Sequence, residues 1–325
     1  MPGRPDTAPT TPAGAPAAPP ADGLPGHPQP AAVTHPHRLP MTDLLLLAVS
    51  VGGISLSAPL ISATAAPALA IAFWRNTMAV GALAPYALLR HRAELRGIGR
   101  RALLLTLAAG LLLALHFALW LPSLHMTSVA SSTALVTTTP LWATLIMRLR
   151  GHRAPAAVWI GTGVAFTGVL VLTGVDLSLS LRALSGDALA LAAGLAAAGY
   201  LLLGAEVRRT VSTTAYTLLC YATTALLLLV AVLVSGTALH GWDAGTWWKL
   251  VLLTATAQLL GHSLSNRVVR TLGPSVTSTA ILLETPGAAL IAAVWLGQLP
   301  PAAAYPAVVL ILAGLVLVIR TNRRG

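Results

Sequence analysis

The sequence predicts an all-α integral membrane protein with ten transmembrane helices arranged as two inverted repeats of five helices. Three observations lead to this fold class. Charged residues are scarce, apolar residues gather in blocks of membrane-crossing length, and the chain repeats itself at one fixed offset.

Composition excludes a water-soluble fold. Hydrophobic residues make up 56% of the chain and charged residues 9%, with a mean hydropathy of +0.78, whereas a soluble domain carries roughly a quarter charged residues. The net charge of +11 does not indicate nucleic-acid binding, because the basic residues lie in short gaps between apolar blocks rather than on one exposed face. Cys220, the single cysteine, cannot form an intrachain disulfide.

Residues 1–40 predict a disordered cytoplasmic tail. They are rich in Pro and Ala and nearly free of large apolar side chains, so they bury too little surface to offset the entropy of ordering. No apolar run follows a basic start as in a signal peptide. The first membrane helix is therefore expected to act as the insertion signal.

The apolar blocks have the length of membrane-spanning helices, since about 20 residues cross a hydrocarbon core of roughly 30 Å. Gly, Pro and charged residues separate them. The predicted helices cover residues 42–62, 67–89, 102–122, 127–148, 156–174, 186–205, 213–235, 247–267, 274–296 and 302–320.

Arginine distribution predicts the orientation. Short cytoplasmic loops collect Lys and Arg, and every second gap here is basic, including the segment from Arg90 to Arg101 and the pair Arg208 and Arg209. The other gaps are acidic or neutral, apart from Arg182 and Lys249. The protein is therefore predicted to cross the cell membrane several times with both termini in the cytoplasm, the second terminus being a short tail at 321–325.

An internal repeat relates the two halves of the chain, which are predicted to be residues 41–174 and 175–320. Because the offset of 146 residues spans five helices, an odd number, the second half must enter the membrane from the opposite side, as in many secondary transporters. The offset superimposes these pairs: His116 and His262, Thr133 and Thr279, Ala134 and Ala280, Pro140 and Pro286, Gly151 and Gly297, Pro155 and Pro301, Gly168 and Gly314.

These features resemble an EamA-type member of the drug/metabolite transporter superfamily. The resemblance covers residues 42–320 and includes Phe73-Trp74-Arg75 and the runs 133–140 (TALVTTTP) and 279–286 (TAILLETP). It implies ten helices in two EamA repeats and transport of a small molecule. Family repeats commonly end their fourth helix with Leu-Gly-Glu, whereas the equivalent sites here are Leu149-Arg150-Gly151-His152 and Leu296-Gly297-Gln298.

Two charged residues lie near the middle of predicted helices. Arg75 in the second helix must face protein or a watery cavity, because an insertion scale assigns roughly 2.5 to 3.5 kcal/mol to a central Arg. It is a candidate for binding a substrate carboxylate, or a structural partner for a carboxylate or backbone carbonyls. Glu284 in the ninth helix is a candidate for proton coupling, unless Arg75 pairs with it.

Two prolines predict bends beside these positions. Pro140 and Pro286 each remove a backbone donor inside a helix, so the fourth and ninth helices should kink there. Thr138 is the repeat mate of Glu284 and is expected to line the same cavity.

Further polar and aromatic residues complete the candidate binding site. His116 with Trp120, and Gln258, His262 and Asn266, recur at a spacing of four, which places each set on one helix face. They indicate either a polar cavity wall or hydrogen bonding between helices. Tyr200 and Tyr221 are candidate substrate contacts or packing residues.

The predicted function is a secondary transporter that exports a small metabolite or drug-like compound by alternating access. Predicted partners are this small-molecule substrate, the lipid bilayer and a coupling proton. Glycines such as Gly163 and Gly168 permit close helix approach within the chain or across a homodimer. The alternatives are a channel, a lipid scramblase or a membrane-embedded enzyme. No cofactor, metal or nucleic acid is expected, and no zinc or nucleophile motif marks an enzyme.

Overall fold

The structure is a computed structural model that describes residues 41–151, 155–261, 282–300 and 304–321, with single positions at 264, 268, 280 and 302. Within these residues the secondary structure is helical and contains no strand. The predicted tail 1–40 and most of the predicted tail 321–325 lie outside the described residues. The family-like run that begins at Thr279 lies largely outside them as well.

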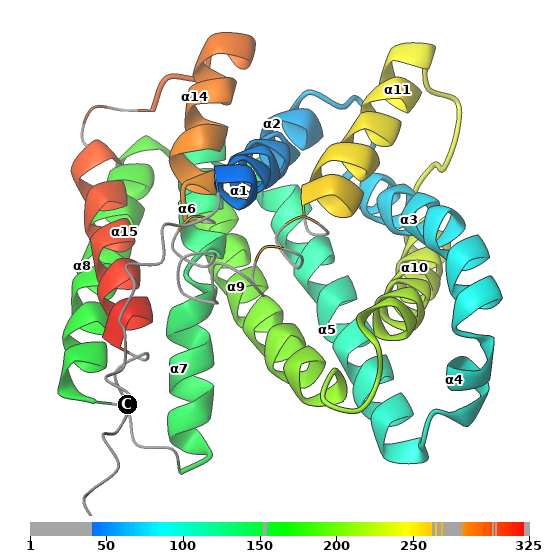
Figure 1. The fold of residues 1–325 in the computed structure, drawn as a ribbon. Helices are drawn as coiled ribbons and strands as arrows, with labels where there is room; N and C mark the ends of the chain where they lie inside the picture. The colour runs from blue at the N-terminus through cyan, green and yellow to red at the C-terminus, as the bar shows by residue number, and fades with distance from the viewer. Residues whose placement is uncertain are drawn as a thin grey trace, which may run out of the picture. The chain divides into compact units, whose positions relative to one another are not determined.

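The first half of the chain folds into helices at the predicted positions (Figure 1). Its first predicted span is formed by two consecutive helices, and its fourth by two helices separated by a turn. The helices are α1 (Met41–Ser55), α2 (Ser57–Ser62), α3 (Ala68–Arg90), α4 (Arg92–Gly97), α5 (Arg100–Ser123), α6 (Val129–Val136), α7 (Thr139–Leu149) and α8 (Ala156–Leu179).

The second half follows the same pattern. An α-helix continues directly into a π-helix in the eighth predicted span, and the ninth is described only from its middle onward. The elements are α9 (Leu181–Val207), α10 (Thr213–Ser235), α11 (Ala244–Leu253), the π-helix η1 (Thr254–Gly261), α14 (Glu284–Leu296) and α15 (Ala304–Thr321).

Helix boundaries differ from the prediction in two places. The gap expected between 174 and 186 is almost entirely helical, because α8 runs to Leu179 and α9 begins at Leu181. This stretch contains no proline and its leucines alternate with polar residues, so no strong breaker stops either helix. The short helix α4 was not predicted and lies in the basic segment after α3.

Polar caps fix the starts of several helices. Ser128, Ser180, Ser212 and Asp243 each accept a hydrogen bond from a backbone N–H in the first turn of α6, α9, α10 and α11 respectively. These caps satisfy N–H groups that have no partner inside the helix.

Five segments are long and apolar enough to cross a membrane among the described residues. They are Met41–Ser62, Arg100–Ser123, Val129–Leu149, Leu181–Val207 and Thr213–Ser235. Helix α3 has 23 residues but carries Arg75 and Asn76, which lower its mean hydropathy.

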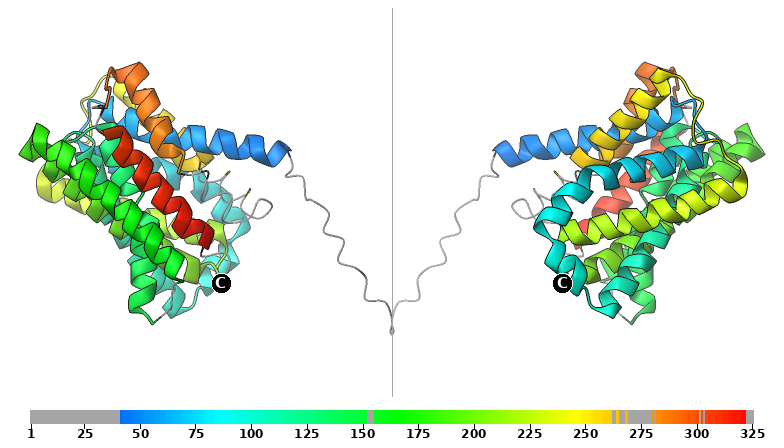
Figure 2. Two further views of the ribbon diagram at one scale, coloured as in Figure 1. Left: turned by 90° about the vertical axis from the view of Figure 1, so that its left-hand side faces the viewer. Right: turned by 90° about the vertical axis from the view of Figure 1, so that its right-hand side faces the viewer.

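Helix pairs from the two halves pack side by side. α5 packs on α9, α3 on α10, and α8 on α15, and the last pair can be followed in Figures 1 and 2. A Cβ added at Gly168 of α8 would lie 2.8 Å from Ile311 Cγ1, and one added at Gly314 of α15 would lie 2.6 Å from Ala165 Cβ. Glycine is therefore needed for this close approach.

The two glycine contacts are equivalent under the sequence repeat. Adding 146 to Gly168 gives Gly314, and adding 146 to Ala165 gives Ile311, so each contact is the other with the halves exchanged. This reciprocity is what a twofold axis between α8 and α15 produces. Gly163 has nothing within 4 Å of an added Cβ and takes no part in the packing.

Candidate functional site

A cavity of about 390 Å³ lies between helices from both halves. Its walls come from α1, α2, α3, α5, α6, α7, α9, α10, η1 and α14, whereas α8 and α15 do not line it. The size is within the range of sites for small organic molecules. Most of the residues predicted for binding that the structure describes line it: Arg75, His116, Trp120, Tyr200, Tyr221 and Glu284. Pro140, predicted as a helix kink, also lines it.

Arg75 contributes the cation of the cavity. Its side chain is buried, at 2% exposure, and its Nε donates to Gln258 Oε1 at 2.7 Å. The guanidinium carbon lies 4.6 Å from the centre of the Phe117 ring, a cation–π distance. Nη1 is buried and has no hydrogen-bond partner among the described residues. The group is therefore held on one edge and on one face, while Nη1 is left available.

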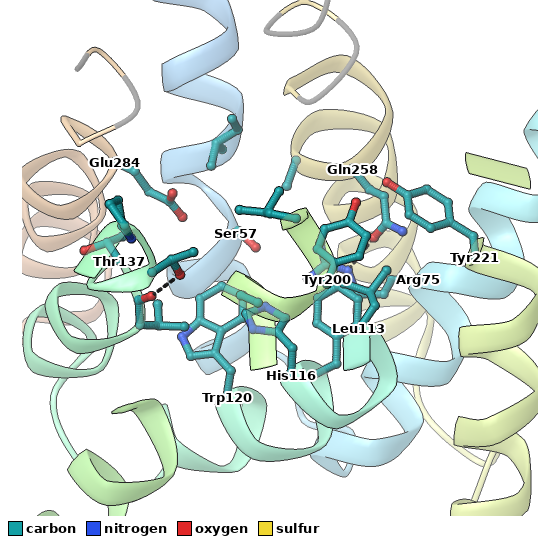
Figure 3. Close-up of a pocket in the computed structure, with 18 of the residues that line it drawn as sticks. Ser57, Arg75, Leu113, His116, Trp120, Thr137, Tyr200, Tyr221, Gln258 and Glu284 are labelled. Atoms are coloured by element: carbon teal, nitrogen blue, oxygen red, sulfur yellow. Dashed lines mark hydrogen bonds between the residues drawn. The ribbon is translucent and has the colours of Figure 1, made fainter. Parts of the chain in front are cut away.

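Glu284 contributes the carboxylate from another wall. It is the first residue of α14, and Figure 3 shows it across the cavity from Arg75, with Ser57 between them. Among the described residues no salt bridge joins Arg75 and Glu284, although their charges interact electrostatically. An acidic and a basic side chain thus line one cavity without a direct salt bridge.

Interrupted helices bring backbone turns to the cavity. Thr137 and Thr138 separate α6 from α7, and Pro140 lies in the first turn of α7. Its mate Pro286 likewise lies in the first turn of α14. Both prolines are therefore placed where a helix begins again, a position that does not need their missing N–H.

Of the three threonines at this break, one is packed in the protein interior and two line the cavity. Thr138 is buried, its hydroxyl donates to the Leu135 carbonyl at 2.6 Å, and it does not line the cavity. Its neighbours Thr137 and Thr139 do. The Thr137 hydroxyl also lies 3.2 Å from the Thr285 hydroxyl, which links the breaks of the two halves.

Aromatic rings form the remaining walls. His116 and Trp120 stack with their ring centres 5.6 Å apart, and His116 Nδ1 lies 3.0 Å from the Ala193 carbonyl oxygen. Trp120 Nε1 is buried without a hydrogen-bond partner among the described residues. Tyr200 and Tyr221 enter from α9 and α10. His262 and Asn266 lie outside the described residues.

Sequence spacing alone missed several lining residues, among them Ser57, Phe117 and Thr137. The repeat offset carries a signal that could have found others. Three pairs of lining residues are repeat mates: Ile54 and Tyr200, Arg75 and Tyr221, Val136 and Leu282.

A second cavity of about 350 Å³ lies beside the first. The two share Tyr200, Leu201, Tyr221 and Gln258. The second cavity extends along α9 and α10 as far as Arg208 and Thr213. The two cavities therefore adjoin each other, one beside Arg75 and Glu284 and the other beside the basic gap between α9 and α10.

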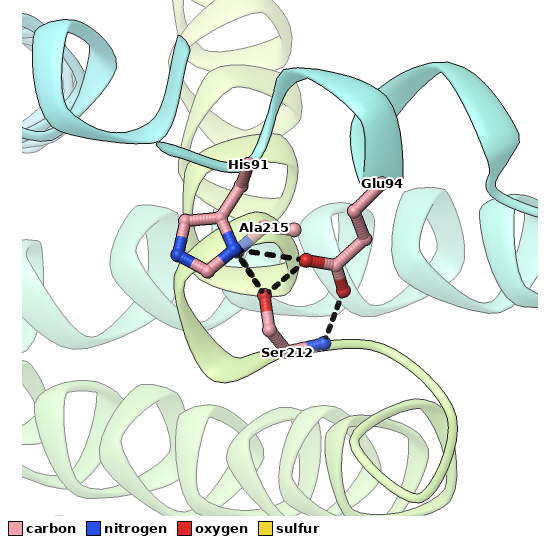
Figure 4. Close-up of polar contacts among 4 residues, drawn as sticks. All are labelled: His91, Glu94, Ser212 and Ala215. Atoms are coloured by element: carbon pink, nitrogen blue, oxygen red, sulfur yellow. Dashed lines mark hydrogen bonds and ion pairs between the residues drawn. The ribbon is translucent and has the colours of Figure 1, made fainter. Parts of the chain in front are cut away.

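Beside this gap, a polar cluster joins the two halves (Figure 4). Glu94 accepts hydrogen bonds from the backbone N–H and the hydroxyl of Ser212, the latter at 2.7 Å, and lies 3.0 Å from His91 Nδ1. The hydrogen bond from the Ser212 backbone is the main cause that lowers the pKa of Glu94. The cluster ties the segment after α3 to the start of α10.

No group of three or more His, Cys, Asp or Glu side chains within the described ranges could hold a metal ion. The chemistry of the site is that of one cation, one acid, an imidazole, hydroxyls and aromatic faces. These groups can bind and release a small molecule.

Comparisons with known proteins found a matching family and a similar solved structure. A sequence model of the EamA-like transporter family matches residues 41–174 and 184–320. No curated protein matches. A solved structure titled only "Crystal structure of protein" is similar at a TM-score of 0.60 and 18% identity, covering 88% of this chain and 99% of that one. This likeness concerns the fold alone.

Proposed function

Because the chain belongs to the EamA-like transporter family, we propose that it is a secondary carrier that exports a small organic compound from the cytoplasm through the cavity between its two halves. The observation that carries the proposal is the placement of Arg75 and Glu284 on separate walls of one cavity. An enclosed site with unlike charges can hold a polar substrate away from lipid.

Alternation between two open states requires halves that can exchange conformations. The reciprocal contacts of Gly168 and Gly314 support such a relation, since one operation exchanges α8 with α15. We therefore propose ten spans in two inverted repeats, with the substrate bound where the repeats meet.

The second cavity supports a proposal for the direction of loading. It reaches Arg208, in a gap that the arginine distribution assigns to the cytoplasm together with both termini. We propose that substrate enters from the cytoplasm through the second cavity, and that the cavity beside Arg75 opens to the opposite side of the membrane in the other conformation of the carrier.

The two charges have different proposed roles. Arg75 binds an anionic group of the substrate, because no described residue accepts a hydrogen bond from its buried Nη1 and a guanidinium matches a carboxylate. Glu284 takes and releases the coupling proton, because water reaches it from one side at a time in a carrier. Protonation of Glu284 would then alternate with substrate binding.

Transport in reconstituted vesicles tests the proposal. Comparing the small-molecule contents of cells with and without the overproduced protein identifies the substrate, and its flux should saturate and show counterflow. We expect Arg75→Ala to lower the apparent affinity for the substrate by about a hundredfold and Glu284→Gln to abolish the dependence of the flux on a proton gradient. Wild-type transport by both variants would contradict the site assignment, and flux that does not saturate would indicate a channel.

A further inference from the structure

The residue that holds Arg75 belongs to an unusual stretch of helix. Gln258 lies in η1, a π-helix of eight residues, and is 3% exposed. π-Helical turns are rare and are found mostly at functional sites. Because an α-helix advances about 100° per residue, an extra residue in a turn rotates the side chains that follow by a similar angle.

The equivalent helix of the first half contains no π-helical segment. Its mate, Leu112, lies in the regular helix α5 and does not line the cavity. Leu112 instead packs against α9, where its Cδ1 would lie 2.8 Å from a Cβ added at Gly199. The π-helix therefore marks the one half whose residue at this position contacts the buried cation.

A chain of hydrogen bonds fixes the amide of Gln258. Its oxygen accepts from Arg75 Nε at 2.7 Å, and its nitrogen donates to Asn76 Oδ1 at 3.1 Å. Asn76 in turn donates to the Ala72 carbonyl at 2.8 Å. Since each amide both donates and accepts, the chain has one consistent direction and ends on the backbone of α3.

The contacts of Arg75 indicate the role of these hydrogen bonds. Gln258 occupies Nε and Phe117 covers one face of the guanidinium, while Glu284 faces the same cavity without a salt bridge to Arg75. We propose that Gln258 is a positioning residue that holds Arg75 away from Glu284, so that the empty carrier presents an unneutralised cation selective for carboxylates. This inference rests on the proposed anion site at Arg75.

Two probes of one size but different charge test the inference. Benzoate and benzamide are titrated into the purified full chain, and binding is followed by ligand-observed NMR. We expect the wild-type protein to bind benzoate more tightly, by on the order of tenfold, as one charged hydrogen-bonded contact would give. Gln258→Met keeps the length of the side chain and should bring the ratio of the benzoate and benzamide affinities close to one.

A double variant separates positioning from simple packing. When Glu284→Gln is added to Gln258→Met, the acid can no longer attract Arg75, so the preference for benzoate should return. A preference that persists in Gln258→Met, an equal loss of both probes, or a loss that the second change does not restore would each overturn the positioning role. A wild-type protein without any preference would instead overturn the anion site itself.

Discussion

The two halves of this protein share their helix packing but differ in the charged residues that they contribute to the cavity. Their glycines make equivalent contacts between α8 and α15, and Pro140 and Pro286 begin equivalent helices. At the cavity, however, Arg75 faces its mate Tyr221 and the mate of Glu284 is Thr138. The repeat therefore preserves helix packing, while each half carries a different charged group.

This difference has a physical reason. Packing residues must fit the same neighbours in both halves, so their sizes are constrained in the same way. A buried charge needs its own partners and is costly without them, and two like charges in one cavity would repel each other. One cation and one acid, each from a different half, avoid that repulsion.

The largest expected effect comes from removing the cation. Arg75→Ala should lower the apparent affinity for the transported anion by about a hundredfold, the size expected for two charge-assisted hydrogen bonds. Uptake into reconstituted vesicles measures it. Tyr221→Phe, at the mate position, keeps the ring and serves as the control. An equal loss in both variants would indicate that the halves are equivalent at this site.

The equivalent helix packing of the two halves is tested at Gly168 and Gly314. Gly314→Val and Gly168→Val should each destabilise the protein by about 1 to 3 kcal/mol, because the added methyl groups overlap the facing helix. Unfolding in detergent measures the loss. Gly163→Val is the matched control, since nothing lies within 4 Å of an added Cβ there. Very different effects at the two mates would break the proposed equivalence of the halves.

A smaller, pH-dependent effect on stability is expected at the contact between Glu94 and Ser212, which joins the two halves. The pKa of Glu94 is lowered mainly by the hydrogen bond from the Ser212 backbone. The stability it adds is therefore present above the unfolded-state value of about 4.3. It is lost as the pH falls through the lower folded-state pKa.

Glu94→Gln measures this contribution. The variant should be less stable than wild type at neutral pH by less than about 1 kcal/mol, the size of a partly exposed ionic contact, and the difference should vanish at acidic pH. Unfolding of both proteins from pH 7 to pH 3 provides the comparison. A difference that grows on acidification would contradict the assigned cause.

Helix positions followed from the sequence because apolar blocks and their breakers are local features. Arg75 and Glu284 could be singled out because a charge inside an apolar block is conspicuous. The partner of Arg75 could not, because Gln258 reaches it through a π-helical turn that no periodicity indicates. The burial of Thr138 depends on its bond to Leu135 at a break whose register the prolines alone do not fix.

The central claim is that the two halves are inverted across the membrane around one cavity. Leu149 is the last residue of α7 and Leu299 follows the equivalent helix α14 by three residues. They are 80% and 76% exposed, so single cysteines at these positions report the side of the membrane that each helix end reaches. With Cys220 replaced by Ser, a membrane-impermeant thiol reagent should label Leu149→Cys only from the cytoplasmic side and Leu299→Cys only from the opposite side. Labelling of both from the same side would contradict the inverted repeat and the carrier mechanism that depends on it.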